Sequence, residues 1–205
     1  MTTKMKAVLS LAAVAVLASC ATLPTREETM KVVKSSFKER GIAKLDRLDQ
    51  SELQQACSEA SLKNKDLPKD VRERLEKQQM ATIKFPADGK FLGDWQAGER
   101  VAQTGVGMQW SDNEQTVNGG NCYACHQLSP QEISYGNIGP SLKHYGKLRG
   151  NSEAVVKYTW GKIWNTHAFN LCSQMPRYGD AGILSEAQIK DVMALLLDPN
   201  SPVNK

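Results

Sequence analysis

Five consecutive residues in the second half of the chain, Cys122-Tyr123-Ala124-Cys125-His126, constrain its fold more than any other feature. Two thiols separated by two residues and followed directly by a histidine form the C-x-x-C-H attachment sequence of a c-type haem. On a helical turn such thiols reach the two vinyl groups of one haem, and the imidazole faces the iron. We therefore predict one covalently bound haem c, linked through Cys122 and Cys125, with His126 as an axial iron ligand.

Redox-active dithiols and zinc sites also contain C-x-x-C. A zinc site needs four ligands, and the sequence has no second C-x-x-C and no H-x-x-x-H pair. A thioredoxin-like site would require a βαβ pattern around the motif, and no segment alternates convincingly as a strand. These two alternatives are therefore weaker than haem attachment.

Residues 1–20 have the pattern of an export signal. Lys4 and Lys6 precede an apolar run of about 13 residues, which is too short to cross a bilayer but typical of a signal peptide. The run ends in Leu-Ala-Ser-Cys, which resembles a bacterial lipobox, so we expect Cys20 to carry lipid and to anchor the protein to a membrane. Cleavage after Ala21 is the alternative. Both predict export to the periplasm, where disulfides persist.

Cys57 and Cys172 remain once the haem-binding and lipidated cysteines are assigned. In an oxidising compartment two remaining thiols most simply pair. Cys57 lies with Leu53, Ala56 and Ala60 on the apolar face of an expected helix. We predict a Cys57–Cys172 disulfide that joins the N-terminal region to the haem domain, with two buried free thiols as the alternative.

The mature chain is expected to be all-α, with a helical extension over residues 21–85 and a cytochrome domain over residues 86–205. The turn at residues 85–90 marks the boundary. In the extension, three expected helix starts are Thr25 with Glu28, Asp49 with Glu52, and Asp66 with Pro68 at the first helical position.

In the cytochrome domain we expect helices over residues 93–105, from the haem motif onward, over residues 152–165 behind Asn151, and from Ser185 to Asp198. Gly98 would allow another helix to approach closely. Ser185 with Gln188 forms a capping box.

The second axial ligand has five candidates: Met175, His144, His167, Met108 and Met193. Core packing explains Met193, which lies on the apolar stripe of the last helix, and the histidines are by default solvated. Met175 is followed by Pro176 between two helices, in a stiff loop that can arch over a haem face. We predict Met175, because a thioether ligand raises the potential and suits electron transfer.

Pro140, in the segment Ile-Gly-Pro-Ser-Leu after the haem motif, is expected to accept a hydrogen bond from His126 Nδ1–H. Such a bond to the ligand imidazole fixes its tautomer and basicity. A simple loop turn is the alternative. Tyr145, Lys147 and Arg149 are candidates for holding the haem propionates.

Several segments together carry a resemblance to a known family: GNCYACHQL, NIGPSL, YGKLRG, CSQMPRYG and GILSEAQIKDVMALLLDPNSPVN. Their order resembles class I cytochrome c, and over about residues 93–204 they resemble the SoxX family. SoxX is the small cytochrome subunit of the SoxAX complex of bacterial thiosulfate oxidation. The long extension with Cys57 is similar to the longer forms of this subunit, whereas a lipid anchor departs from the simpler members.

The resemblance implies a heterodimer with a SoxA-like cytochrome, acting as an L-cysteine S-thiosulfotransferase that joins thiosulfate to a carrier-protein cysteine. In that family the reacting haem belongs to SoxA, and SoxX passes electrons to a downstream cytochrome c. This chain would then be the electron-transfer subunit of an enzyme and not catalytic alone. Carried over, Cys122 and Cys125 hold the haem, and His126 and Met175 are axial.

Charge and the remaining alternatives narrow the function further. Lys and Arg number 26 against 22 Asp and Glu, or 24 against 22 without Lys4 and Lys6, and no basic run exists, so we expect no nucleic-acid partner. A free-standing periplasmic cytochrome that delivers electrons to an oxidase is the alternative function. A haem sensor is disfavoured, since Met175 would fill the sixth iron site.

Overall fold

The architecture comes from a computed structural model, in which residues 23–205 are described. The predicted signal segment and Cys20 lie outside the described residues. Within residues 23–205 the regular structure is helical, and the β-structure is limited to an isolated bridge between Arg40 and Ala43. No helix in this part of the chain is both long enough and apolar enough to span a bilayer. The prediction of an all-α fold is confirmed.

The described residues divide into two compact units. The first contains residues 23–39 and 44–48, and the second contains residues 40–43 and 49–205. The haem motif and both cysteines of the predicted disulfide lie in the second unit. The division therefore falls well before the turn at residues 85–90, where the sequence pattern placed the boundary.

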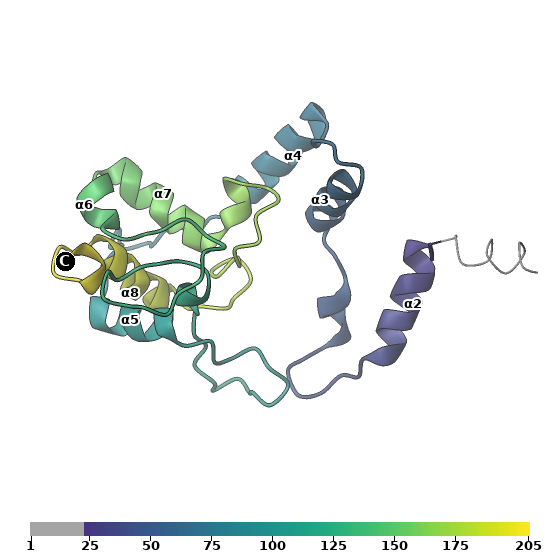
Figure 1. Cartoon of the computed structure of the whole chain (residues 1–205), viewed down its shortest axis with the longest axis horizontal. Helices are drawn as coiled ribbons and strands as arrows, with labels where there is room; N and C mark the ends of the chain where they lie inside the picture. The colour runs from purple at the N-terminus through teal and green to yellow at the C-terminus, as the bar shows by residue number, and fades with distance from the viewer. Residues whose placement is uncertain (1–22) are drawn as a thin grey trace, which may run out of the picture. The chain divides into compact units, whose positions relative to one another are not determined.

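The first unit consists mainly of helix α2, Arg26–Ser36 (Figure 1). The predicted capping box is present: the backbone N–H of Glu28 donates to Thr25 Oγ1 at 3.2 Å, and that of Thr25 donates to Glu28 Oε2 at 2.8 Å. The helix ends at Ser36 because Phe37 is already extended. No residue of α2 is buried, so local capping rather than packing stabilises this helix.

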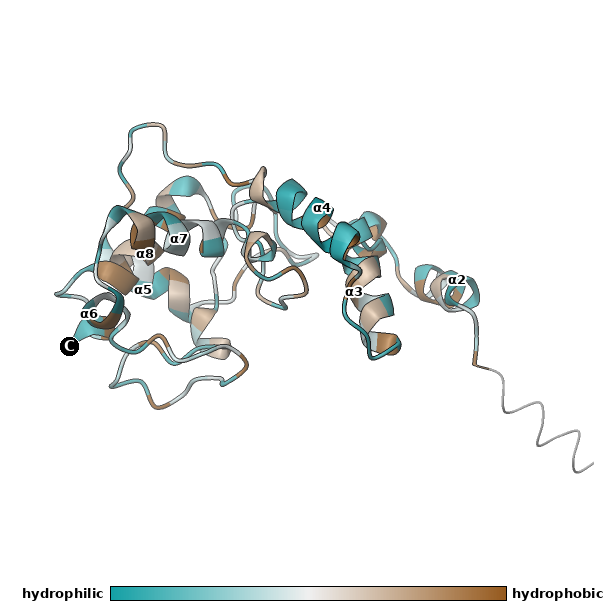
Figure 2. Cartoon of the chain, turned by 90° about the horizontal axis from the view of Figure 1, so that it is seen from above, coloured by the Kyte–Doolittle hydropathy of each residue, from teal (hydrophilic) through white to brown (hydrophobic). Residues whose placement is uncertain are grey.

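The core of the second unit forms where α5, Trp95–Gln103, packs against α8, Glu186–Leu197. The predicted close approach at Gly98 is confirmed, since a Cβ there would overlap the backbone carbonyl of Asp191. The capping box that begins α8, with Ser185 and Gln188, is also confirmed. Helix α7, Glu153–Trp164, packs against α8 and contributes the fully buried Trp160. Figure 2 shows the resulting concentration of apolar residues on α8.

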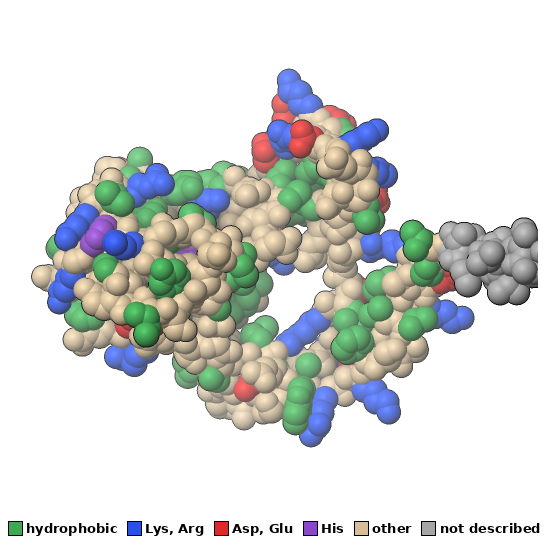
Figure 3. Space-filling model, viewed as in Figure 1, with side chains coloured by type: hydrophobic (Ala, Val, Ile, Leu, Met, Phe, Trp, Pro, Cys, Tyr) green, Lys and Arg blue, Asp and Glu red, His purple; other side chains and the backbone are tan. Residues whose placement is uncertain are grey.

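Helices α3, Glu52–Leu62, and α4, Lys69–Met80, form a hairpin with a small core of its own. Its buried residues are Leu53, Leu75 and, from the second half of the chain, Leu171. Charged side chains of both signs cover the outer surface of α4 (Figure 3), and Leu75 is the buried residue of that helix. Each helix thus contributes only a narrow apolar stripe.

The expected starts of these two helices were wrong. Helix α3 is capped by Ser51, whose Oγ accepts from the backbone N–H of Gln54 in a full capping box, rather than by Asp49 with Glu52. Helix α4 begins after Pro68, without a side-chain cap, rather than at a cap formed by Asp66. Serine with glutamine forms the same reciprocal pair of hydrogen bonds two residues later along the chain.

The segment after α4 is fixed to α7 by two indole groups. Trp160 Nε1–H donates to the Lys84 carbonyl at 2.8 Å, and Trp164 Nε1–H donates to the Thr82 carbonyl at 3.0 Å. The Asn165 amide adds a 3.0 Å hydrogen bond to Gln79 Oε1. These long-range bonds explain why the α3–α4 hairpin belongs to the same unit as the cytochrome core.

Short helices complete the unit around the site. They are η2, Cys122–Ala124; α6, Tyr145–Arg149; η3, Thr166–Ala168; and η4, Pro202–Asn204; a further short helix, η1, Leu45–Leu48, lies in the first unit. The haem motif therefore forms a single 3₁₀ turn, and the expectation that it opens an α-helix was wrong. Helix α7 is capped by Ser152 rather than Asn151, because the Ser152 Oγ accepts a hydrogen bond from the backbone N–H of Val155.

Candidate haem site

A cavity of about 570 Å³ lies among η2, α6, α7, α8 and the loop before α8. Its volume is in the range of small-molecule and cofactor pockets, and its lining is mainly apolar. The motif residues Cys122, Cys125 and His126 line one side. Met175 and Pro140 line it as well, so the predicted site residues of the haem domain meet at one cavity.

The backbone of the motif makes a tight turn. The N–H groups of Cys125 and His126 both donate to the Cys122 carbonyl, at 3.1 and 2.9 Å. This turn brings both unpaired thiols and the imidazole to the same cavity. Burial raises the pKa of the Cys122 thiol to about 12. Redox-active dithiols require a lowered thiol pKa, so this environment does not suit dithiol exchange.

The His126 imidazole is oriented by one hydrogen bond and by close packing. Its Nδ1–H donates to the Pro140 carbonyl at 2.7 Å. Since a carbonyl only accepts, this bond assigns the proton to Nδ1 and leaves Nε2 to bind a metal. A Cβ on Gly139 would overlap the ring, so glycine is needed where the loop passes the imidazole.

Of the five candidates for the second iron ligand, Met175 lines the cavity. All five candidates lie in the described part of the chain, and the other four do not line it. Met193 is fully buried in α8, and His167 Nε2 is hydrogen-bonded to the Ser173 carbonyl at 3.1 Å. His144 precedes α6 in a left-handed conformation, and Met108 lies in the loop before the motif.

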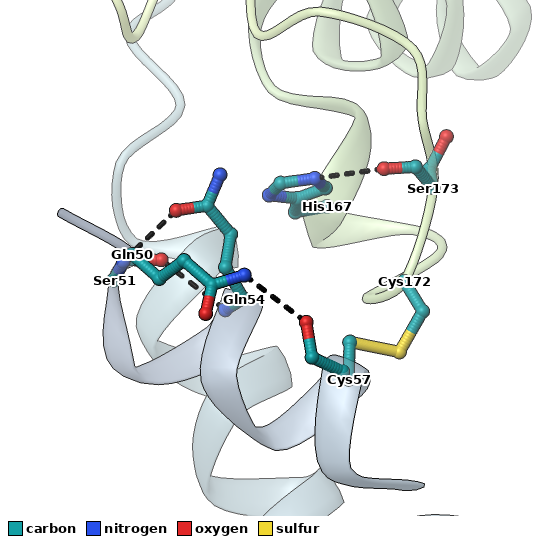
Figure 4. The surroundings of a disulfide bond; sticks show 8 residues. Gln50, Ser51, Gln54, Cys57, His167, Cys172 and Ser173 are labelled. Atoms are coloured by element: carbon teal, nitrogen blue, oxygen red, sulfur yellow. Dashed lines mark hydrogen bonds between the residues drawn. A yellow bond between two sulfur atoms is a disulfide. The ribbon is translucent and has the colours of Figure 1, made fainter. Parts of the chain in front are cut away.

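The loop that carries Met175 is joined to α3 by the predicted disulfide. The sulfur atoms of Cys57 and Cys172 are bonded, and their Cα atoms are 5.5 Å apart, as is usual for disulfides. Figure 4 shows the bond running from α3 to the segment just before Ser173. Cys172 also lines the cavity, so this disulfide lies next to the site as well as joining two regions.

Cationic and hydroxyl groups line another part of the cavity. Arg149 and Tyr145, both proposed from the sequence for the haem propionates, line it, whereas Lys147 does not. The structure adds Lys162 and Thr159 from α7, and Thr159 Oγ1 is 2.8 Å from the Tyr145 hydroxyl. Partial burial lowers the pKa of Lys162. The positive charges of Arg149 and Lys162 suit the carboxylates of a haem.

Sequence reasoning also missed a polar cluster behind the motif. The Tyr123 hydroxyl donates to Glu99 Oε1 at 3.0 Å and accepts from the backbone N–H of Ser129 at 3.3 Å. Burial raises the pKa of the Glu99 carboxyl, and its second oxygen is buried without a partner. Tyrosine at the second motif position carries no signal of this contact, because Glu99 lies on a different helix.

The donor set fits a haem c. Cys122 and Cys125 would form the thioether links, and His126 Nε2 and the Met175 sulfur would hold the iron. No cluster of three His, Cys, Asp or Glu side chains occurs among residues 23–205, so these residues offer no competing metal site of that kind. A haem held here would supply one-electron redox chemistry, while the chain orients the ligands and surrounds them with apolar groups.

Comparisons with known proteins agree with this geometry. Residues 111–198 match the model of the cytochrome c family, a range that includes both thiols, His126 and Met175. A protein of Aquifex aeolicus (strain VF5), described as an uncharacterized lipoprotein, is 41% identical over 135 residues. The alignment covers 63% of this chain, and the chain spans 61% of that relative's length.

The helical fold of residues 23–205, the lining of the cavity and the match of residues 111–198 agree on a domain of the cytochrome c type. The chain contains a cytochrome c domain, with the class I fold and additional helices before it. Cytochrome c domains are electron-transfer haem proteins, so the match supports the predictions of haem, iron and electron transport at the level of this domain.

Proposed function

We propose that this protein is a monohaem c-type cytochrome that accepts electrons within a SoxAX-type thiosulfate-oxidising complex. The observation that carries the electron-transfer role is the convergence of His126 and Met175 on the cavity that also contains both motif thiols. With two protein ligands on the iron no position remains for a substrate, which suits outer-sphere electron transfer.

The SoxX resemblance supplies the reaction. Joining thiosulfate to a carrier cysteine forms one S–S bond and releases two electrons and one proton from the thiol. This chain would take these electrons from the partner one at a time and pass each to a downstream cytochrome c. Its own cysteines leave no nucleophile, since Cys57 and Cys172 are bonded, Cys122 and Cys125 would carry the haem, and Cys20 would carry lipid.

A membrane attachment is part of the proposal. The relative is described as a lipoprotein, and Leu-Ala-Ser-Cys ends the apolar run of this sequence. We propose that Cys20 is lipidated and that the protein acts at a periplasmic membrane surface. Each buried acyl methylene contributes about 0.8 kcal/mol to such an anchor. Cys20→Ser should release the protein from membranes or leave it unprocessed.

Affinity purification of the tagged chain from detergent-solubilised native membranes, followed by haem staining, tests the partner. The expected result is a second c-type cytochrome in stoichiometric amount. If the protein purifies alone and reduces a terminal oxidase directly, it is a free-standing electron carrier instead.

Reconstitution tests the division of labour. The isolated chain should be reducible by ascorbate but show no thiosulfate-dependent conjugation of a carrier cysteine, and adding the copurified cytochrome should restore turnover. As a control, Met108→Leu changes a methionine that does not line the cavity. In the reconstituted mixture this variant should support the same turnover as the wild type. Substantial conjugation by the isolated chain would place the reactive site here and contradict the proposal.

A further inference from the structure

We propose that the α3–α4 hairpin, through the Cys57–Cys172 disulfide, positions Met175 as the axial ligand. Breaking this disulfide would then open the sixth coordination site of the iron. The inference rests on the haem and Met175 assignments made under the proposed function, and it goes beyond them by giving the N-terminal helices a role at the metal.

The first argument is position along the chain. Cys172 precedes Met175 by three residues, and Cys172, Ser173 and Met175 all line the cavity. Between the end of η3 at Ala168 and the start of α8 at Glu186 the chain has no regular helix. A covalent bond at Cys172 therefore limits how far Met175 can move from the cavity.

The second argument is that the hydrogen bonds of residues 169–175 are local, whereas the long-range bonds of this loop begin at Tyr178, on the C-terminal side of Met175. Ser173 is their centre: its Oγ accepts from the Met175 backbone N–H at 3.2 Å and from Thr166 Oγ1 at 3.3 Å, and its carbonyl accepts from His167 Nε2 at 3.1 Å. Figure 4 shows the His167 contact beside the disulfide. These bonds shape the loop against η3, but each gives only about 1 kcal/mol of net stability.

The third argument is that the hairpin is itself anchored. Leu171, next to Cys172, is buried with Leu53 of α3 and Leu75 of α4. The far end of α4 is held to α7 through the hydrogen bonds that Trp160 and Trp164 make to the backbone of residues 82–84. The disulfide thus connects the ligand loop to an element with its own attachment to the core.

The bond is also accessible to a reagent. Cys172 is exposed and Cys57 is half-buried. A water-soluble phosphine reduces a disulfide to two thiols and becomes the phosphine oxide, with water supplying the oxygen and both protons. Ascorbate reduces haem iron but leaves disulfides intact, so the two redox centres can be addressed separately.

Carbon monoxide binding to the ferrous protein measures opening of the sixth site. With ascorbate alone, the wild type should bind carbon monoxide slowly. Adding the phosphine should raise the rate at least about tenfold, which corresponds to ~1.4 kcal/mol in the opening equilibrium. The Cys57→Ser/Cys172→Ser variant should bind at the faster rate and be insensitive to the phosphine.

The matched control is Val203→Ala, which removes buried volume from the main core without lining the cavity. It should lower thermal stability yet keep the slow rate. If Val203→Ala opens the site as much as disulfide loss, or if the double variant binds within twofold of wild type, the inference is overturned. A wild type without the weak far-red ferric band of a methionine-ligated haem would instead refute the Met175 assignment, and this inference with it.

Discussion

The apolar cluster around α5, α7 and α8 and the one under the α3–α4 hairpin differ in size and in how they are closed. The first buries fifteen residues, with Trp160 and Ile189 fully enclosed, and none of these fifteen is part of a disulfide. The second buries three leucines and is closed by a disulfide between residues 115 positions apart. A core of three leucines contributes little, so the hairpin depends on its covalent link and on contacts to its neighbour.

Trp160→Ala should have the largest effect, because it affects both regions. The substitution removes a fully buried indole that packs edge-to-face on Phe91, with ring centroids 5.5 Å apart, and leaves the Lys84 carbonyl without its donor. We expect the free energy of unfolding to fall by about 3–5 kcal/mol in a denaturant titration.

The control is Lys157→Ala on the exposed face of α7, where loss of the ion pair with Glu153 should change stability by about 0.5 kcal/mol or less. A Trp160→Ala protein as stable as that control would mean that α7 is not the joint between the two regions.

The Cys57→Ser/Cys172→Ser variant should let the α3–α4 hairpin unfold independently of the cluster around α5, α7 and α8. Closing a loop of this length stabilises by about 4.7 kcal/mol in the chain-entropy model, and we expect a measured loss of about 2–4 kcal/mol. Native-state hydrogen exchange should speed up at the amides of α3 and α4 and stay unchanged in α8. Uniform acceleration across all of these helices would show that the two clusters unfold as one.

The helix ends show what local sequence can and cannot predict. The capping boxes at Thr25 and Ser185 were read correctly, since each involves residues three positions apart. Asp49 and Asp66 were wrong as caps because the N-cap residues are Ser51 and Pro68 instead, and only two positions separate each pair of alternatives. Local signals identify a helix more reliably than they identify its first residue.

The candidate haem site likewise has residues that local sequence predicts and residues that it does not. The motif thiols and His126 could be predicted because haem attachment requires this spacing. The disulfide followed from the two cysteines that remained once the others had been assigned. The contacts of Lys84 with Trp160 and of Glu99 with Tyr123 join residues far apart in the sequence. Nothing in either local segment specifies its partner, so the domain boundary and the buried carboxylate were found only in the structure.

Glu99→Gln should have the smallest effect, confined to pH dependence. Burial raises the pKa of Glu99 above its ordinary 4.5, so the folded chain keeps this proton to higher pH than the unfolded chain. The free energy of unfolding should therefore fall as the pH rises from 4.5 through the pKa of the folded state. Glu99→Gln should flatten this decline in titrations from pH 4.5 upward, and an unchanged slope would show that Glu99 does not cause it.

The ferric absorption spectrum of wild type and Met175→Ala tests the central claim most directly, because it reports the atom that completes the iron site. We expect the wild type to show the weak far-red band of histidine–methionine ligation. Met175→Ala should lack that band, and its midpoint potential should be lower by on the order of 100 mV. The control Met193→Leu, buried in α8, should keep both the band and the potential. An unchanged spectrum and potential in Met175→Ala would contradict the account, since the second axial ligand would then lie elsewhere.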